Sequence, residues 1–290
     1  MMSRSYKLVL FFVFIFTQVS AGAFTKNPQN YYGAEFYDHT LVSAHDEELK
    51  MALKKILKSG HIRQSDKADQ LVESCSGVKN CFEQTSLGYD GARRFLFGKF
   101  YLVKLSDGQF GVQEKYCDRI YQKEDFKSGN LPGPDVIPEG TVINIEHTWP
   151  QSKFSGRYPK DLQKADMHHL FPTDSKMNSL RGNSPFGEVQ QDSGSAKCSA
   201  SRFGSSLESN VKVFEPPQDH RGHVARALFY FSMRYDMPIK PSEENILKKW
   251  NKDQPVDAEE LARNEEIYKL QGNRNPFIDH PELADNISDF

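Results

Sequence analysis

The sequence predicts a single domain of mixed α+β class, and three observations lead to that prediction. Its last third carries apolar residues at helical spacing, whereas its middle holds a short run of β-branched residues between segments rich in glycine and proline. No internal repeat occurs, and no linker is long enough to separate two domains. A chain of 290 residues can bury one large hydrophobic core.

The first residues have the pattern of a secretory signal peptide. Arg4 and Lys7 precede the apolar residues 8–16, and small residues follow at 19–23. An uncleaved membrane anchor is the alternative, but a helix needs about 20 apolar residues to cross a bilayer. We therefore expect the signal peptide to be residues 1–23, with cleavage near 21–23. The mature domain, 24–290, is then expected to be secreted or periplasmic, with no membrane segment.

Export would place the cysteines in an oxidising compartment, which favours disulfides over free thiols. Cys75, Cys81, Cys117 and Cys198 allow three pairings, and we favour Cys75 with Cys81 and Cys117 with Cys198. A zinc site is the alternative for these cysteines, but no CxxC spacing occurs.

Apolar periodicity and end signals predict the helices. Residues 43–60 have an apolar stripe, a capping residue in Ser43 and a terminal Gly60, and the polar residues after them predict a loop over 61–85. The other predicted helices are 174–180 with Thr173 or Asp174 as its cap, 223–235, 242–250 capped by Ser242, and 257–270 capped by Asp257 and closed by Gly272.

The one predicted strand covers 141–147. It follows a loop over 126–140 that contains three prolines and three glycines, and a Trp-Pro pair stops it. Residues 182–210 are rich in Gly, Ser and Asn and predict an extended surface excursion. The segment 89–101 mixes aromatic residues with arginines, a pattern that favours buried rings beside paired arginines over a nucleic-acid surface.

The formal net charge is −2, and it becomes −4 when the two cations of the signal peptide are removed. An acidic protein cannot bind a polyanion through its overall charge and needs a local basic surface. Between 153 and 164 there are four cations against the single acid Asp161. These cations are Lys153, Arg157, Lys160 and Lys164.

Three stretches carry side chains suited to chemistry: NIEHTWPQS at 144–152, ADMHHLFPTD at 165–174 and SKMNSLRGNSPFGE at 175–188. His147 can act as a general base, because the ordinary pKa of histidine lies near 6.5. Glu146 and Asn178 offer oxygen ligands, which suit Mg²⁺ or Ca²⁺ and not Zn²⁺. A base and a hard cation are what phosphodiester hydrolysis requires.

Neighbouring side chains of a strand point to opposite faces. Glu146 and His147 can therefore share one pocket only if the strand ends, bulges or twists at this point, and the following Trp-Pro pair favours an end. The same argument applies to His168 and His169, of which at most one is expected to face the site.

These stretches resemble the bacterial endonuclease I family, which comprises periplasmic and extracellular nucleases with a ββα-metal (His-Me finger) active site. The resemblance also includes YDGARRFLF at 89–97, FEPPQDHRGHVARALFYFSMRY at 214–235 and QGNRNPFIDHPE at 271–282, and the order and spacing of these motifs make it specific. It implies one endonuclease I-like nuclease domain, in which helices surround a ββα-metal core.

The resemblance also assigns roles to residues. It implies that His147 is the general base, and that Glu146 and Asn178 bind Mg²⁺, or Ca²⁺ or Mn²⁺ in its place. For the phosphate-stabilising cation, Arg157 is the best match, with Lys160 behind it. The partners implied are DNA and RNA, bound through the phosphate backbone by a monomer and cut with little sequence preference to 5′-phosphate ends. Three further polar residues are expected to support the site: His169, Arg181 and Asn183, the last also as a possible end of the 174–180 helix.

Two other functions fit parts of the pattern. A secreted zinc hydrolase could use His147 with His168 or His169, but the sequence has no HExxH or other compact zinc spacing. A catalytically silent nucleic-acid-binding relative would be expected to lack His147, Glu146 or Asn178, and all three are present.

Overall fold

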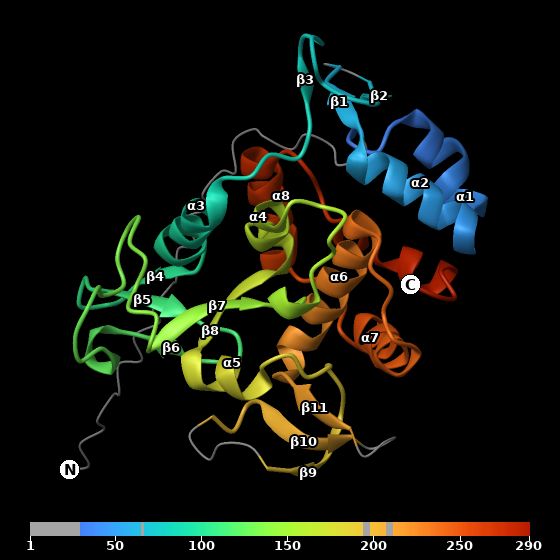
Figure 1. Cartoon of the computed structure of the whole chain (residues 1–290). Helices are drawn as coiled ribbons and strands as arrows, with labels where there is room; N and C mark the ends of the chain where they lie inside the picture. Colours follow the sequence, from blue (N-terminus) through green and yellow to red (C-terminus); the bar gives the residue numbers. More distant parts are fainter. Residues whose placement is uncertain (1–29, 65–66, 194–197, 207–210) are drawn as a thin grey trace, which may run out of the picture.

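The computed structural model describes residues 30–64, 67–193, 198–206 and 211–290. The predicted signal peptide, 1–23, lies outside the described residues. The described chain is a mixed α+β domain of helices and small antiparallel sheets, as the sequence predicts (Figure 1). Within the described ranges, no helix combines the length and apolar character needed to cross a membrane.

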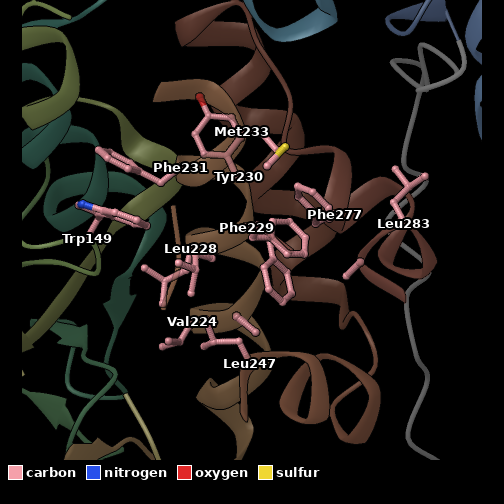
Figure 2. Close-up of a cluster of buried hydrophobic side chains, with 14 of the residues drawn as sticks. Trp149, Val224, Leu228, Phe229, Tyr230, Phe231, Met233, Leu247, Phe277 and Leu283 are labelled. Atoms are coloured by element: carbon pink, nitrogen blue, oxygen red, sulfur yellow. The ribbon is translucent and has the colours of Figure 1, made fainter. Parts of the chain in front are cut away.

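A long, almost wholly buried helix, α6, forms the centre of the fold (Figure 1). The hydrophobic core gathers around its apolar side chains, with Trp149 approaching from the segment after the predicted strand (Figure 2). The Trp149 ring stacks on Phe231 of α6 at 5.2 Å between centroids. The described α-helices are α1 (Leu41–Ser43), α2 (Asp46–Lys58), α3 (Gly88–Phe95), α4 (Lys160–Lys164), α5 (Ser175–Arg181), α6 (Gln218–Tyr235), α7 (Pro241–Asp253), α8 (Ala258–Gln271) and α9 (Pro276–Asp279).

Two antiparallel strands and the helix that follows them carry the motif residues. Strand β7 (Ile143–His147) pairs with β8 (Leu170–Asp174), and Glu146 lies opposite Phe171 in the register. Helix α5 begins directly after β8 because the Asp174 side chain accepts hydrogen bonds from the first free backbone N–H groups of the helix. The chain therefore runs strand, strand, helix through this region, with Asp174 as the predicted cap.

The remaining described strands form three small antiparallel sheets, and the sequence predicts none of their strands. The predicted loop 61–85 contains most of the first sheet, and the predicted excursion 182–210 contains two strands of the third. Their strands have at most five residues and pair across the loops between them, so no local alternation reveals them. The sheets are β2-β1-β3 (β1 Gly60–Ile62, β2 Gln70–Val72, β3 Cys81–Phe82), β4-β5-β6 (β4 Leu102–Lys104, β5 Phe110–Gln113, β6 Ile120–Tyr121) and β11-β10-β9 (β9 Val189–Asp192, β10 Arg202–Ser206, β11 Lys212–Glu215).

Several predicted helix ends are wrong by a few residues. Ser43 does not cap α2, because the helix begins at Asp46 and the Ser43 hydroxyl instead donates to the carbonyl of His39. Gly60 opens β1 and does not close α2. A Cβ at Gly60 would lie 2.8 Å from Cys75 Sγ, so this glycine permits the strand to pass close to a disulfide.

Among the C-terminal helices, two predicted starts are wrong, whereas one predicted cap and one predicted end are correct. Helix α6 begins at Gln218, before the predicted start at 223, and α7 begins at Pro241 with no side-chain cap, so Ser242 does not cap it. Asp257 caps α8 by accepting from the backbone N–H of Glu260, and Gly272 ends that helix with a φ of 87°, both as predicted.

The disulfides join Cys75 to Cys81 and Cys117 to Cys198, the pairing that the sequence favours. All four cysteines are described, and none is free. The alternative of a cysteine zinc site is thereby excluded, since a disulfide sulfur has no thiolate to bind a metal.

Candidate active site

His147 is the last residue of β7, and its imidazole is held in one orientation. Nε2 lies 3.0 Å from the backbone carbonyl oxygen of Lys164, at the end of α4. Because a carbonyl oxygen only accepts, Nε2 carries the hydrogen, and the unprotonated Nδ1 accepts a hydrogen bond from the Gln151 amide. Nδ1 lies 3.3 Å from the side-chain amide nitrogen of Gln151, an exposed residue. The nitrogen that can take up a proton is therefore Nδ1.

The surroundings of His147 keep its ring uncharged. Burial, with a smaller contribution from His169, lowers the pKa of His147 to about 3. The rings of Tyr89 and His169 lie 5.3 Å and 5.4 Å from the imidazole, centroid to centroid. A histidine in this state is neutral near pH 7, which is the form that a general base needs.

Glu146 is buried one residue earlier and has a different set of partners. Its Oε1 accepts a hydrogen bond from Arg181 at 2.7 Å and another from the Tyr116 hydroxyl at 3.0 Å. Burial raises the pKa of Glu146 to about 7, although the Arg181 charge and both hydrogen bonds act in the opposite direction. Both bonds reach Oε1, so Oε2 is the oxygen through which this carboxylate could bind a cation.

Asn178 lies in the middle of α5, and a contact with β7 fixes its amide. Its Nδ2 donates to Oδ1 of Asn144 at 2.8 Å. Asn144 comes two residues before Glu146 and therefore lies on the same face of β7. The Asn178 Oδ1 remains as an acceptor on that side. One carboxylate oxygen and one amide oxygen are a donor set that fits a hard divalent cation such as Mg²⁺.

The strand ends at His147, as expected from the Trp-Pro pair. The alternation of side chains still holds up to that end, because Glu146 contacts Tyr116 and Arg181 whereas His147 contacts Lys164 and Gln151. His147 and Glu146 are thus neighbours in the sequence, but different residues hold their side chains in place.

Arg181 links the two sets of contacts. Besides Glu146, its guanidinium donates to the backbone carbonyls of His147 at 3.1 Å and Thr148 at 2.8 Å. Its side chain is 2% exposed, so it faces no solvent. The expectation that Arg181 supports the site agrees with this geometry, and the buried ion pair with Glu146 makes the support electrostatic as well as steric.

Of the other two residues expected to support the site, His169 lies beside His147, whereas Asn183 is exposed. His169 is buried behind His147, with Nε2 2.8 Å from the carbonyl of Gln163, and burial lowers its pKa to about 4. His168 points elsewhere, because its Nε2 lies 3.1 Å from the carbonyl of Asn273. Asn183 is exposed and does not end α5; Gly182 does, with a φ of 57° that suits glycine.

The cations of the stretch 153–164 have unequal surroundings. Lys153 donates to the backbone carbonyl of Asn183 at 2.9 Å. Arg157 and Lys160 are exposed, and within the described ranges their side chains make no hydrogen bond or ion pair. Lys164 places its Nζ 4.6 Å from the centroid of the Tyr89 ring.

Four residues of the site were not predicted. Asn144 could have been, because the alternation of a strand puts it on the same face as Glu146. Tyr116, Gln151 and Tyr89 had no such signal, since only the folded chain brings them to Glu146 and His147.

A separate possible metal-binding group lies between α6 and α8. It comprises His223, Asp257 and Glu260, the one such histidine-carboxylate grouping found among the described residues. Arg226 donates to both oxygens of Glu260, and Asp257 already caps α8. The guanidinium therefore competes with a cation for Glu260, and this group is less suited to a metal than the oxygens of Glu146 and Asn178.

Comparison with known proteins identifies the class of this site. The family model described as Endonuclease I matches residues 46–282, and the chain therefore belongs to the endonuclease I family. The match begins well before residue 89, where the recognisable motifs start, so it includes α2 and the first sheet.

Relatives with assigned activities are similar over about three-fifths of the chain. An extracellular ribonuclease of Bacillus subtilis (strain 168) is 38% identical over 186 residues, which cover 58% of this chain and 60% of the relative. An extracellular deoxyribonuclease of Aeromonas hydrophila is 32% identical over 182 residues, covering 61% of this chain and 77% of the relative. A periplasmic deoxyribonuclease of the same organism is 25% identical over 182 residues, with coverage of 61% and 75%. The aligned part spans about three-fifths of the ribonuclease's length.

Proposed function

We propose that this protein is a monomeric, secreted or periplasmic, metal-dependent endonuclease that hydrolyses DNA and RNA with little sequence preference. The family and the names of its extracellular and periplasmic relatives support this proposal. The observation that carries it is the fixed tautomer of His147, because the Lys164 carbonyl leaves Nδ1 as a proton acceptor on the residue that follows Glu146 in the chain. The strand-strand-helix of β7, β8 and α5 is then the ββα-metal core that the resemblance implies.

In the proposed reaction, His147 Nδ1 accepts a proton from a water molecule. The water oxygen forms a bond to phosphorus while the bond from phosphorus to the 3′ oxygen breaks, which leaves the phosphate on the 5′ end. The neutral state of His147 allows this proton transfer near pH 7, and the Lys164 carbonyl stabilises the protonated ring through the Nε2 hydrogen.

Glu146 Oε2 and Asn178 Oδ1 would hold the cation, with Mg²⁺ the best fit and Ca²⁺ or Mn²⁺ as alternatives. A bound divalent cation would neutralise charge on the phosphate and on the leaving oxygen. Arg181 and Tyr116 orient the Glu146 carboxylate through Oε1, and Asn144 orients the Asn178 amide. Such supporting hydrogen bonds fix the direction of the ligand oxygens before substrate arrives.

The nucleic acid would bind through its phosphates to the basic stretch 153–164. Arg157 is the best match in this chain for the cation that contacts the scissile phosphate in the family, and its exposed, unpaired side chain is free to reach a substrate. No base-reading element is required for such binding, since phosphate contacts carry no sequence information.

Digestion of supercoiled plasmid and of RNA by the mature chain tests the proposal. We expect both to be cut with Mg²⁺, with products that carry 5′ phosphates, and we expect EDTA to stop the reaction. Activity that persists in EDTA would exclude metal dependence. Activity that trace Zn²⁺ restores and Mg²⁺ does not would favour the zinc hydrolase considered from the sequence.

A further inference from the structure

Lys164 combines two contacts with the proposed general base. Its backbone carbonyl accepts the Nε2 hydrogen of His147 at 3.0 Å. Its side chain places Nζ 4.6 Å from the centre of the Tyr89 ring, and that ring lies 5.3 Å from the imidazole. One residue thereby fixes the tautomer of the base and places a positive charge on a ring that packs against it.

The Tyr89 ring holds the Lys164 ammonium in position. An ammonium within about 6 Å of an aromatic centroid is attracted by the ring, by about 0.5–1 kcal/mol at an exposed site and more when it is partly desolvated. Tyr89 and Lys164 are both partly buried, and α3 packs against α4 at this point. The cation therefore has a preferred location before any substrate binds, which is the condition for effective electrostatic stabilisation.

The charge of Lys164 is also available. Arg93, the other cation over the Tyr89 ring at 4.8 Å, is paired with Asp90 at 2.5 Å. Lys164 makes no ion pair with any described residue.

The other cations of the stretch 153–164 lack this placement. Lys153 donates to the Asn183 carbonyl, and the exposed side chains of Arg157 and Lys160 have no described partner that fixes them. Before it could stabilise a transition state, a mobile surface cation would have to lose side-chain entropy on binding, whereas Lys164 is already restrained.

We propose that Lys164 binds the phosphate group being cleaved, next to His147, and that Tyr89 is its positioning residue. This inference rests on the proposed nuclease function and assigns the phosphate contact to Lys164 in place of Arg157. The ammonium would donate to a non-bridging oxygen of the phosphate, while Nδ1 of the adjacent His147 receives the proton of the attacking water.

Single-turnover cleavage of duplex DNA at saturating enzyme and Mg²⁺ tests the assignment, because affinity no longer limits the rate there. Lys164→Met preserves the backbone carbonyl and most of the length of the side chain but removes the charge. We expect it to lower the rate about 10²- to 10³-fold, the effect of removing one preorganised donor. Lys164→Arg should recover much of the loss, and Arg157→Ala should fall far less than Lys164→Met.

Lys58→Met is the matched control. Lys58 also lies over a tyrosine ring, with Nζ 5.6 Å from the centroid of Tyr158, but it belongs to α2 and pairs with Asp236. Its replacement should leave the single-turnover rate of the folded enzyme unchanged. Any loss of stability in either variant is measured separately by thermal unfolding.

A double-mutant cycle tests the role of Tyr89. Tyr89→Leu removes the ring and should slow cleavage, whereas Tyr89→Phe keeps the ring and should slow it far less. In combination with Lys164→Met, Tyr89→Leu should add little further loss, because the ring acts through the ammonium. Fully additive losses would remove Tyr89 as the positioning residue.

Two failures can be told apart. If the wild type cleaves DNA and Lys164→Met matches it, the Lys164 assignment is wrong and the proposed nuclease function stands. If the wild type does not cleave DNA or RNA with any of the three cations, the proposed function fails and the Lys164 assignment fails with it. A loss in Arg157→Ala equal to that in Lys164→Met would also overturn the preference for Lys164.

Discussion

His61 and His147 are two buried histidines with the same first contact and different surroundings. His61 Nε2 lies 3.0 Å from the carbonyl of Ile56, as far as His147 Nε2 lies from the carbonyl of Lys164. Burial lowers the pKa of both. A buried ring with a fixed hydrogen is therefore not sufficient to mark a general base.

The two histidines differ in the surroundings of their second ring nitrogen, Nδ1. His61 Nδ1 lies 3.8 Å from the Asp69 carboxylate, inside the N-terminal region, and its ring stacks on Tyr31 at 4.4 Å. His147 is the last residue of β7 and follows Glu146, and its Nδ1 instead lies 3.3 Å from the side chain of the exposed Gln151. The N-terminal region uses its histidine to join β1 to the core, whereas the β7–β8–α5 region leaves a nitrogen available for chemistry.

The largest effect is expected from replacing the two histidines. His147→Ala should lower the cleavage rate by about 10²- to 10⁴-fold, the contribution of a positioned acid–base group, while DNA binding persists. His61→Ala should lower the free energy of unfolding but leave the rate per folded molecule unchanged. The measurements are single-turnover cleavage, DNA affinity and urea unfolding for each variant. Equal losses of rate would make His147 another structural histidine.

The next largest difference between the two regions is expected from removing their disulfides. Cys117–Cys198 spans 81 residues and lies beside Tyr116, whereas Cys75–Cys81 spans 6 residues in the first sheet. From loop closure alone, replacing both cysteines by serine should cost about 4–5 kcal/mol for the long loop and roughly 2 kcal/mol for the short one. We also expect the replacement of Cys117 and Cys198, but not of Cys75 and Cys81, to raise the Mg²⁺ concentration for half-maximal rate. The reason is that the backbone at Tyr116 would lose the neighbouring disulfide that fixes it.

Urea unfolding and Mg²⁺ titration of the two double variants provide the test. The opposite order of stability, or an increased Mg²⁺ requirement without Cys75–Cys81, would show that the comparison between the regions is wrong.

A smaller effect is expected from the metal ligands and their support. Glu146→Gln and Asn178→Ala should each raise the Mg²⁺ concentration for half-maximal rate, because a site with two protein ligands depends on both. Tyr116→Phe removes only the hydroxyl that orients Glu146 and should weaken metal affinity by roughly 10- to 100-fold, as the loss of such supporting groups does. Asp69→Asn, in the N-terminal region, is the control. Unchanged titrations for Glu146→Gln and Asn178→Ala would defeat the metal assignment.

The smallest effect is expected from the exposed cations. Each of Lys153→Ala, Arg157→Ala and Lys160→Ala should reduce the slope of log affinity against log salt by about 0.9 if that side chain neutralises a phosphate of duplex DNA. Lys55→Ala, an exposed lysine of α2 that pairs with Glu35, should leave the slope unchanged. The affinities are measured with His147→Ala so that the DNA stays intact. A slope that none of the three replacements changes would place the docking surface elsewhere.

The sequence predicts the helix starts of the β7–β8–α5 region and of α8 better than the strands of the N-terminal region, for a physical reason. Asp174 and Asp257 are recognisable caps because a helix start depends on side chains within a few residues. Strands β1 to β3 escape prediction because each has at most three residues and depends on pairing across a loop. The apolar stripe of α2 was correct, although its cap was not.

The same contrast holds inside the site. His147 and Glu146 stand out in the sequence as a neighbouring pair, whereas Tyr116 comes 30 residues before Glu146 and nothing in its own surroundings marks it. Lys164 was visible only as one of four cations, because its position over Tyr89 depends on how α3 packs against α4. Short-range signals predict chemistry along one element, and only the tertiary fold shows which residues support it.

The Cys117–Cys198 bond encloses β7, β8 and α5 within a covalent ring. A protease that cuts one peptide bond anywhere between these cysteines would open the ring but release neither piece. The disulfide would keep the two pieces tethered, and after a cut between Glu146 and Arg181 the buried ion pair of these residues would also join them. A nicked molecule would therefore run as one band on a non-reducing gel and as two on a reducing gel.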